Sequence, residues 1–251
     1  MRVLTLARDL RRRKARERDA LFVVEGVRAV EELLRSPLEI VGVLAAPKLA
    51  ESERGTALRQ ALLARAATIS DVTDREFASA TETDSPQGVL AVARIPERSL
   101  DPLRSQTSFR LLVLDAVQDP GNVGTIVRTA AALGATATVA LPGTVDLWNA
   151  KVVRSAMGAH FHHLALHVTG DHLRAFLSET NTELWGADAR GEELPSSAPA
   201  RLAIAVGNEG AGLTDSVRDW STRRIALPTT PMVESLNVAV ATGILLYELR
   251  Q

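Results

Sequence analysis

The sequence predicts an α/β protein with two domains. Apolar runs of strand length alternate with amphipathic helical segments, this alternation lapses once between residues 96 and 108, and it then resumes with more apolar strands. Strands that alternate with helices favour a mainly parallel sheet covered on both faces. We therefore expect an N-terminal domain at 1–95, a linker at 96–108 and a C-terminal domain at 109–251.

The N-terminal half is predicted to be a small α/β unit. Its expected strands are the apolar segments 21–26, 39–45, 67–70 and 87–95. Its expected helices, where apolar residues recur at helical spacing, are 27–35, 56–67 and 74–80. The linker that follows contains two prolines and no sustained apolar face.

The C-terminal half repeats the alternation more strongly. The expected strands are 110–117, 135–141, 160–168, 183–188, 201–206 and 223–228. The expected helices are 123–133, 147–157, 171–180, 215–220 and 235–249. The last helix is apolar nearly all round, so we expect it to be buried in the core or against a partner subunit.

Composition narrows the class of protein. The chain has 251 residues, of which 46% are apolar, and a formal charge of −1, so affinity for nucleic acid must come from local basic patches. It has no cysteine, which excludes disulfides, thiolate zinc sites and a cysteine nucleophile. No signal segment and no apolar run long enough to span a bilayer is evident. We expect a soluble cytoplasmic protein that does not act on membranes.

A basic segment opens the chain. Its candidate RNA-binding residues are Arg11, Arg12, Arg13, Lys14 and Arg16. Two interpretations are open from the residues alone: a solvated helix face, or an arm that contacts phosphates.

The first polar cluster in the apolar half follows a strand and opens a helix. Free N–H groups and the positive end of the helix dipole make such a junction suitable for polar or anionic ligands. Asn122 has a structural explanation as a helix N-cap. Arg128 has small residues one turn away on the helix, so a ligand can approach it closely, although the side chain could also simply extend into water.

The second cluster is the sequence GNEGAG after an apolar strand. Its glycine order and the short helix that follows do not match a dinucleotide-binding fingerprint. A ligand-free glycine turn is the plain alternative. Glu209 favours function, because a carboxylate between apolar segments either accepts N–H groups or is desolvated with a raised pKa.

The third cluster precedes the terminal helix. Capping accounts for one polar residue there, but Glu234, Ser235 and Asn237 together exceed what one helix start needs. Because loops at strand and helix junctions build the ligand sites of α/β proteins, we interpret the three clusters as one site.

The three clusters resemble the motifs of the SpoU/TrmH ribose 2′-O-methyltransferases of the SPOUT superfamily. The matching patterns are N-x-G-x-x-x-R at 122–128, G-x-E-x-x-G-L at 207–213 and S-L-N-V-A at 235–239. FVVEG and SPQGVLAV in the first half are similar to the substrate-binding domain of these enzymes. The resemblance implies a C-terminal trefoil knot, a homodimer, bound S-adenosyl-L-methionine and RNA as the substrate.

Site residues follow from the resemblance. It implies catalytic roles for Asn122, Arg128, Glu209, Ser235 and Asn237. It implies cofactor binding by the backbone around Gly207, Leu227 and Leu236. The chain departs from the family at Thr229, Thr230 and Pro231, where the family often has I-P-M-x-G, so the loop that holds the cofactor can differ in shape.

The expected reaction transfers a methyl group to a ribose 2′-hydroxyl. It needs no metal, and the five histidines have no carboxylate at ligand spacing. An arginine guanidinium is a poor base, so stabilisation of alkoxide charge is preferred for Arg128, with a base role left open. Ribosomal RNA is the first expected substrate and transfer RNA the second. A noncatalytic RNA-binding protein and a nucleotide-binding or redox enzyme are the alternatives.

Overall fold

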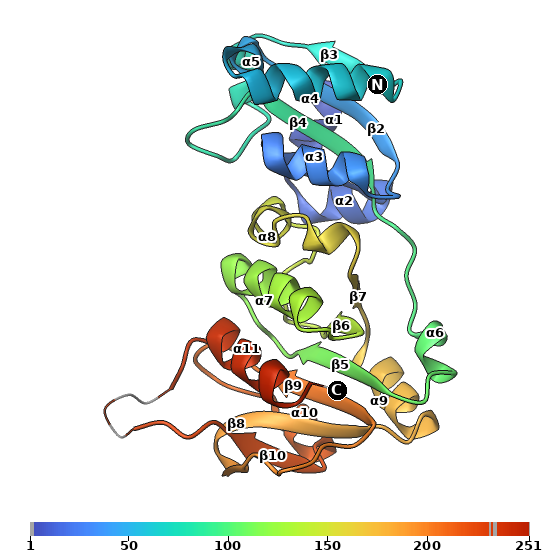
Figure 1. Cartoon of the computed structure of the whole chain (residues 1–251), viewed down its shortest axis with the longest axis vertical. Coiled ribbons are helices and arrows are strands. Elements are labelled where there is room, and N and C mark those ends of the chain that lie inside the picture. Colours follow the sequence, from blue (N-terminus) through green and yellow to red (C-terminus); the bar gives the residue numbers. More distant parts are fainter. Residues whose placement is uncertain (1–2, 231, 233–234, 251) are drawn as a thin grey trace. The chain divides into compact units, whose positions relative to one another are not determined.

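The computed structural model describes residues 3–230, 232 and 235–250. The chain forms two compact units, one from residues up to 97 together with 148–162 and the other from 98–147 together with 163 onward (Figure 1). The segment 148–162, which lies within the predicted C-terminal domain, thus groups with the N-terminal residues.

The first unit is built on a mixed sheet of four strands in the order β1-β4-β2-β3. Its strands are β1 (Leu21–Glu25), β2 (Ile40–Ala45), β3 (Ile69–Asp71) and β4 (Val89–Arg94). Its helices are α1 (Val3–Asp9), α2 (Arg13–Asp19), α3 (Val27–Arg35), η1 (Pro47–Glu51), α4 (Glu53–Ala64), α5 (Asp74–Ala78), α8 (Ala150–Ser155) and η2 (Ala159–Phe161). Apolar side chains of α1, α5, β1, β2 and β4 form one buried cluster.

The segment 148–162 completes the apolar packing of the first unit. The Trp148 ring lies 4.4 Å from the Phe22 ring of β1, and the Phe161 ring lies 6.1 Å from it. Nη1 of Arg154 donates to Oγ1 of Thr83 at 3.1 Å. The first unit therefore needs two separate stretches of the chain.

The second unit contains an all-parallel sheet of six strands in the order β10-β8-β9-β5-β6-β7. The strands are β5 (Phe109–Leu114), β6 (Ala137–Ala140), β7 (Leu164–His167), β8 (Glu183–Glu193), β9 (Arg201–Val206) and β10 (Arg223–Ala226). The helices are α6 (Asp101–Arg104), α7 (Pro120–Ala132), α9 (Gly170–Glu179), α10 (Asp215–Trp220) and α11 (Val238–Glu248). The predicted α/β class and parallel sheet are confirmed. The knot stays a prediction.

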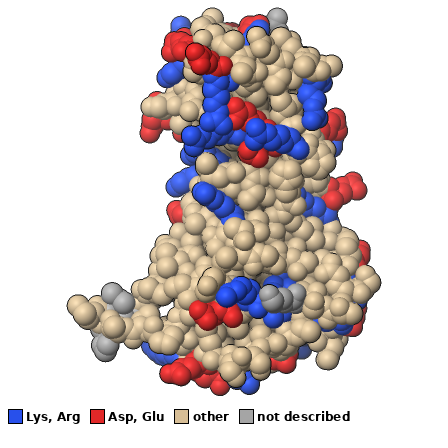
Figure 2. Space-filling model, in the orientation of Figure 1, with Lys and Arg blue, Asp and Glu red and all other residues tan. Residues whose placement is uncertain are grey.

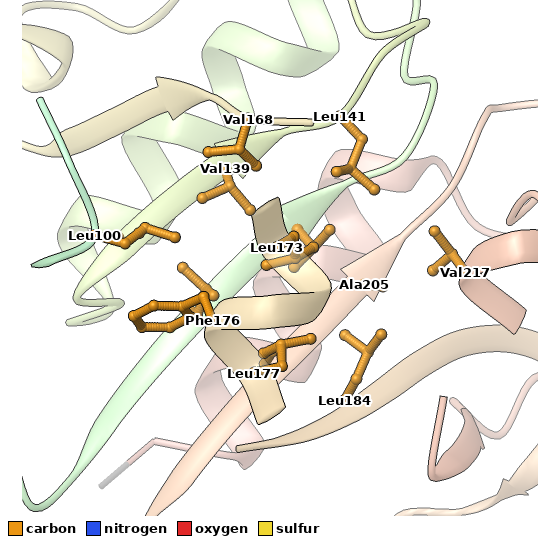
Figure 3. Close-up of a cluster of buried hydrophobic side chains, with 14 of the residues drawn as sticks. Leu100, Val139, Leu141, Val168, Leu173, Phe176, Leu177, Leu184, Ala205 and Val217 are labelled. Carbon is orange, nitrogen blue, oxygen red and sulfur yellow. The ribbon is translucent and has the colours of Figure 1, made fainter. Parts of the chain in front are cut away.

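One face of this sheet packs against α6, α9 and α10. Leu173, Phe176 and Leu177 of α9 lie among the side chains of the central strands (Figure 3). The packing also includes Leu100 and Leu103, so these two residues of the stretch predicted as a linker are part of this core. Helices α7 and α11 pack against each other.

The strand predicted at 160–168 is shorter than expected. Residues 159–161 form a 3₁₀ turn and β7 begins only at Leu164. His160 and His162 therefore both lie outside the strand. None of the described helices combines the length and apolar character needed to cross a bilayer.

His163 is a buried titratable group next to the sheet. Its Nε2 lies 2.8 Å from Oγ1 of the fully buried Thr138. Burial, with a smaller contribution from the charge of Arg98, lowers the pKa of His163 to about 4. The folded protein therefore holds this imidazole neutral at neutral pH.

The lowered pKa predicts an acid-dependent loss of stability. Below the ordinary histidine pKa the unfolded chain binds a proton that the folded chain does not, so stability falls between about pH 6.5 and about pH 4. His163 accounts for about 3 kcal/mol of this loss. Denaturation at several pH values should show a flatter profile for His163→Gln than for wild type. An equally steep profile in this variant would assign the loss of stability to other groups.

Candidate active site

The site lies at the carboxyl edge of the parallel sheet, where α/β proteins bind ligands. Strands β5 and β9 are neighbours with Leu114 paired to Val206, so the loops that follow them begin side by side. The first of these loops leads into α7 and the second contains Glu209. Two motifs that lie more than 80 residues apart in the sequence therefore begin at one place.

Helix α7 begins one turn earlier than predicted. Asp119 is its N-cap and accepts from the Asn122 N–H at 2.8 Å, and Pro120 occupies the first helical position. The explanation of Asn122 as the N-cap is therefore wrong. Its side chain is free of that role and takes part in contacts between motifs.

Glu209 joins the loop before α7 to the loop after β9. Its carboxylate accepts from the backbone N–H groups of Gln118 (3.3 Å) and Asp119 (3.2 Å) and from Nδ2 of Asn122 (3.0 Å). Burial acts to raise its pKa, but the hydrogen bonds from Asn122 and the backbone outweigh burial and lower it. Of the two states expected for Glu209, the structure shows the N–H acceptor, and the raised pKa is wrong.

Asn237 brings in the third motif. It caps α11 by accepting from the N–H groups of Ala239 (2.9 Å) and Val240 (3.3 Å). Its Nδ2 donates to Oδ1 of Asn122 at 3.1 Å. We call Asn122, Glu209 and Asn237 the motif network, because one hydrogen-bonded chain links all three sequence clusters.

Asn208 shapes the glycine-rich loop and was not identified from the sequence. Its Oδ1 accepts from the N–H groups of Gly210 and Ala211, each at 3.0 Å, and its Nδ2 donates to the Ala116 carbonyl at 3.0 Å. Ala116 has a φ of +56°, a conformation disfavoured for residues with a side chain. The asparagine in the turn was itself a signal, because this side chain commonly bonds to the backbone two residues onward.

The backbone at this edge suits a cofactor held by main-chain groups. A Cβ at Gly207 would lie 2.2 Å from the Gly212 carbonyl carbon, so only glycine permits this tight loop. Leu227 follows β10, and Leu236 immediately precedes Asn237 of the motif network. Gly207 and Leu227 each follow a strand end at this edge, and cofactor binding by these two residues and Leu236 stays a prediction.

Arg128 and Ser235 lie outside the motif network. Both are exposed, and neither forms a hydrogen bond or ion pair with another described residue. Arg128 is six residues after Asn122 and so points about 120° away around α7. Glu234 and Pro231, also noted from the sequence, lie outside the described residues.

A groove of about 730 Å³ runs between α7 and α11 beside the motif network. Asn122 and Asn237 stand at one end of its lining, which continues along Thr125, Thr129, Leu133, Ala239, Val240, Gly243, Ile244, Tyr247 and Glu248. Val240, Ile244 and Tyr247 are large apolar side chains left exposed on α11.

The basic N-terminal segment forms helix α2 and its approach, not an extended arm. Arg11, Arg12 and Arg13 are exposed and paired with Glu82, Asp9 and Glu17, respectively. Lys14 is exposed with no partner among the described residues. Basic and acidic side chains are mixed on the face shown in Figure 2. Because exposed ion pairs contribute only about 0–1 kcal/mol, these residues can exchange partners for phosphates.

Arg16 differs from its neighbours. Its side chain is 4% exposed, and its Nη1 donates to the carbonyls of Leu10 (2.7 Å) and Arg11 (2.9 Å). It satisfies carbonyls beyond the end of α1, so a structural role explains this residue and the interpretation as a surface phosphate contact is corrected.

The described residues contain no group of three or more His, Asp or Glu side chains placed to hold a metal ion. A parallel α/β sheet with polar motifs from three loops at its carboxyl edge defines a ligand-binding protein of the α/β class.

Comparisons with known proteins give the family. Residues 110–247 match the SpoU rRNA Methylase family, and residues 4–91 match the MRM3-like substrate binding domain. The chain is 36% identical to the 23S rRNA (guanosine(2553)-2′-O)-methyltransferase RlmP of Bacillus subtilis, over 97% of this chain and 94% of that protein. It is 31% identical to the 23S rRNA (guanosine-2′-O-)-methyltransferase RlmB of Shewanella oneidensis, over 90% of this chain and 95% of that protein. The AdoMet-bound rRNA methyltransferase of Sinorhizobium meliloti has a similar structure, with a TM-score of 0.83 and 25% identity. The match covers 98% of this chain and 93% of that protein.

The chain belongs to the SpoU rRNA methylase family, and it is a methyltransferase. Its N-terminal unit contains the substrate-binding domain of that family. The family resemblance seen in the sequence motifs is confirmed.

The hydrogen bond between Asn122 and Asn237 predicts energetic coupling. Asn237→Ala loses both the α11 cap and the contact to Asn122, whereas Asn122→Ala loses the contacts to Asn237 and Glu209. The double variant should be less destabilised than the sum of the single variants by about 0.5–1.5 kcal/mol in denaturant unfolding. Asn149→Ala, which removes the matched cap of α8, should be additive with Asn122→Ala. Additivity in both pairs would show that the network is not coupled.

Proposed function

We propose that this protein transfers a methyl group from S-adenosyl-L-methionine to a ribose 2′-hydroxyl of 23S ribosomal RNA. The observation that carries the proposal is the motif network, because it assembles the three methyltransferase motifs at one sheet edge. The substrate is supported by the relatives whose names specify 23S rRNA and guanosine. Guanosine is therefore the first nucleotide to examine.

The reaction places defined demands on the site. The bound cofactor supplies an electrophilic methyl group on a sulfonium. The ribose oxygen must be held in line with that methyl carbon and must lose its proton as the bond forms. Backbone groups of Gly207, Leu227 and Leu236 would hold the cofactor at the sheet edge.

Glu209 acts by positioning. Its carboxylate already accepts from four N–H donors, and its lowered pKa makes it a weak proton acceptor. It fixes the loop before α7 and orients the Asn122 amide. Asn237 then sets the start of α11 relative to that amide.

Arg128 is the group that meets the RNA. It is exposed and uncommitted among the described residues, and a guanidinium stays protonated in proteins. It therefore suits binding of the target phosphate and stabilisation of developing alkoxide charge better than removal of the proton. Ser235, exposed beside the network, contacts the substrate.

Arg128→Ala tests this assignment. With an unmethylated 23S rRNA transcript and labelled S-adenosyl-L-methionine, the variant should lose methyl transfer by at least about 100-fold. Calorimetry should show cofactor binding within about twofold of wild type. Arg104→Ala, in a surface ion pair with Asp101 on α6 before strand β5, is the matched control and should stay active. A wild-type protein that methylates a tRNA transcript but not 23S rRNA would overturn the proposed substrate.

The exposed face of α11 supports a homodimer. Its exposed apolar residues border the groove that contains Asn122 and Asn237, so a second copy seated there would cover apolar surface and enclose the motif network.

Ile244→Asp should therefore give a monomer in light scattering and should lose activity, because a charge cannot be buried without a partner. Leu63→Asp is the control: Leu63 is an exposed apolar residue of α4, 57% accessible compared with 39% for Ile244. A dimeric Ile244→Asp variant would place the subunit contact elsewhere.

A further inference from the structure

The two motifs of the N-terminal unit meet at one edge of its sheet. FVVEG ends strand β1 and SPQGVLAV leads into β4, and the two strands are antiparallel with Glu25 paired to Leu90. The Gly26 N–H donates to the Val89 carbonyl at 3.1 Å. The polar residues of both motifs therefore lie together, although they are 60 residues apart in the sequence.

Three of these residues have structural explanations. Gly26 has a φ of +98°, which favours glycine. Oε1 of Gln87 accepts from the Val27 N–H at 2.8 Å and satisfies the start of α3. At Gly88, with a φ of +76°, a Cβ would lie 2.5 Å from the Leu49 nitrogen.

Glu25 has no such explanation. Its side chain is only 9% exposed and Oε1 is wholly buried, yet no described residue donates a hydrogen bond to it. By strand alternation it shares a face with Leu21 and Val23, which belong to an apolar cluster. A buried acceptor without a donor is destabilising, and more so when it is charged. The position therefore reduces stability in the unbound protein.

Two exposed cations lie at the same edge. Arg28 is in the first turn of α3, directly after Gly26. Lys48 follows β2, whose last residue Ala45 pairs with Val89 at the start of β4. Both side chains are exposed, and neither donates a hydrogen bond to a described residue. The edge thus combines a buried acceptor with exposed positive charges.

We propose that the Glu25 side chain turns outward when RNA binds and accepts hydrogen bonds from an unpaired nucleobase of the substrate, while Arg28 and Lys48 contact the flanking phosphates. This inference rests on the proposed function, because it takes the ligand to be RNA. Proteins recognise single-stranded bases through hydrogen bonds to their Watson–Crick edges. They bind the phosphates through cationic side chains. Guanine fits best, because its N1–H and N2–H are adjacent donors that a carboxylate can accept together. The N–H of uracil lies between two carbonyl oxygens, which a carboxylate would repel.

The test measures stability and RNA binding on the same variants. Glu25→Leu removes the carboxylate that lacks a hydrogen-bond donor, so the melting temperature of this variant should equal or exceed that of wild type. Its binding of the 23S rRNA transcript should weaken about tenfold. Glu25→Gln keeps the shape and should weaken binding similarly, which keeps the test valid if the leucine variant misfolds. Glu39→Gln, at an exposed ion pair with Arg94 near the other end of the sheet, should bind as wild type.

Base preference gives a second measurement. Uridine-rich RNA heptamers with a central G, A, C or U should bind wild type most tightly when the centre is G, and Glu25→Gln should lose that preference. Wild-type affinity that is equal for all four heptamers would overturn the assignment. Unchanged transcript binding by Glu25→Gln, beside a wild type that binds, would overturn this inference alone. A wild type that fails to bind the transcript would overturn the proposed function as well.

Discussion

The active-site geometry depends on the Glu209 carboxylate, which joins the loop after β5 to the loop after β9. It accepts from two backbone N–H groups before α7 and from the Asn122 amide, and hydrogen bonds to a charged acceptor are roughly twice as strong as neutral ones. Without this acceptor, the N–H groups of Gln118 and Asp119 would lack their partner. The same amide then accepts from Asn237, so the start of the terminal helix is set by a contact that begins at Glu209.

Much of this arrangement could be predicted from the sequence. Apolar alternation predicted every strand of the parallel sheet, since strands buried on both faces are almost wholly apolar. The sequence also identifies the motif residues Asn122, Glu209 and Asn237, because polar side chains in apolar surroundings require hydrogen-bond partners or a functional role.

Other features could not be predicted, for local physical reasons. The start of α7 is an exception, because Asp119 followed by Pro120 is a helix-start signal that the residues do show. The buried position of Arg16 depends on carbonyls presented by α1, and charge runs carry no information on which member turns inward. Residues 98–108 lack periodicity, yet Leu100 and Leu103 are core residues because a single short turn suffices to bury them. Tertiary contacts, not spacing, decide such positions.

The stretch 148–162 limits where the chain can be cut into separately folding fragments. Phe22 of the substrate-binding unit packs on Trp148 and Phe161, which the chain supplies from between β6 and β7 of the catalytic sheet. A cut near residue 97 would therefore leave aromatic rings exposed on both fragments. If relatives exchanged their RNA-recognition units, the exchanged sequence would have to include residues 148–162. The N-terminal and C-terminal halves of the chain are therefore expected to diversify together.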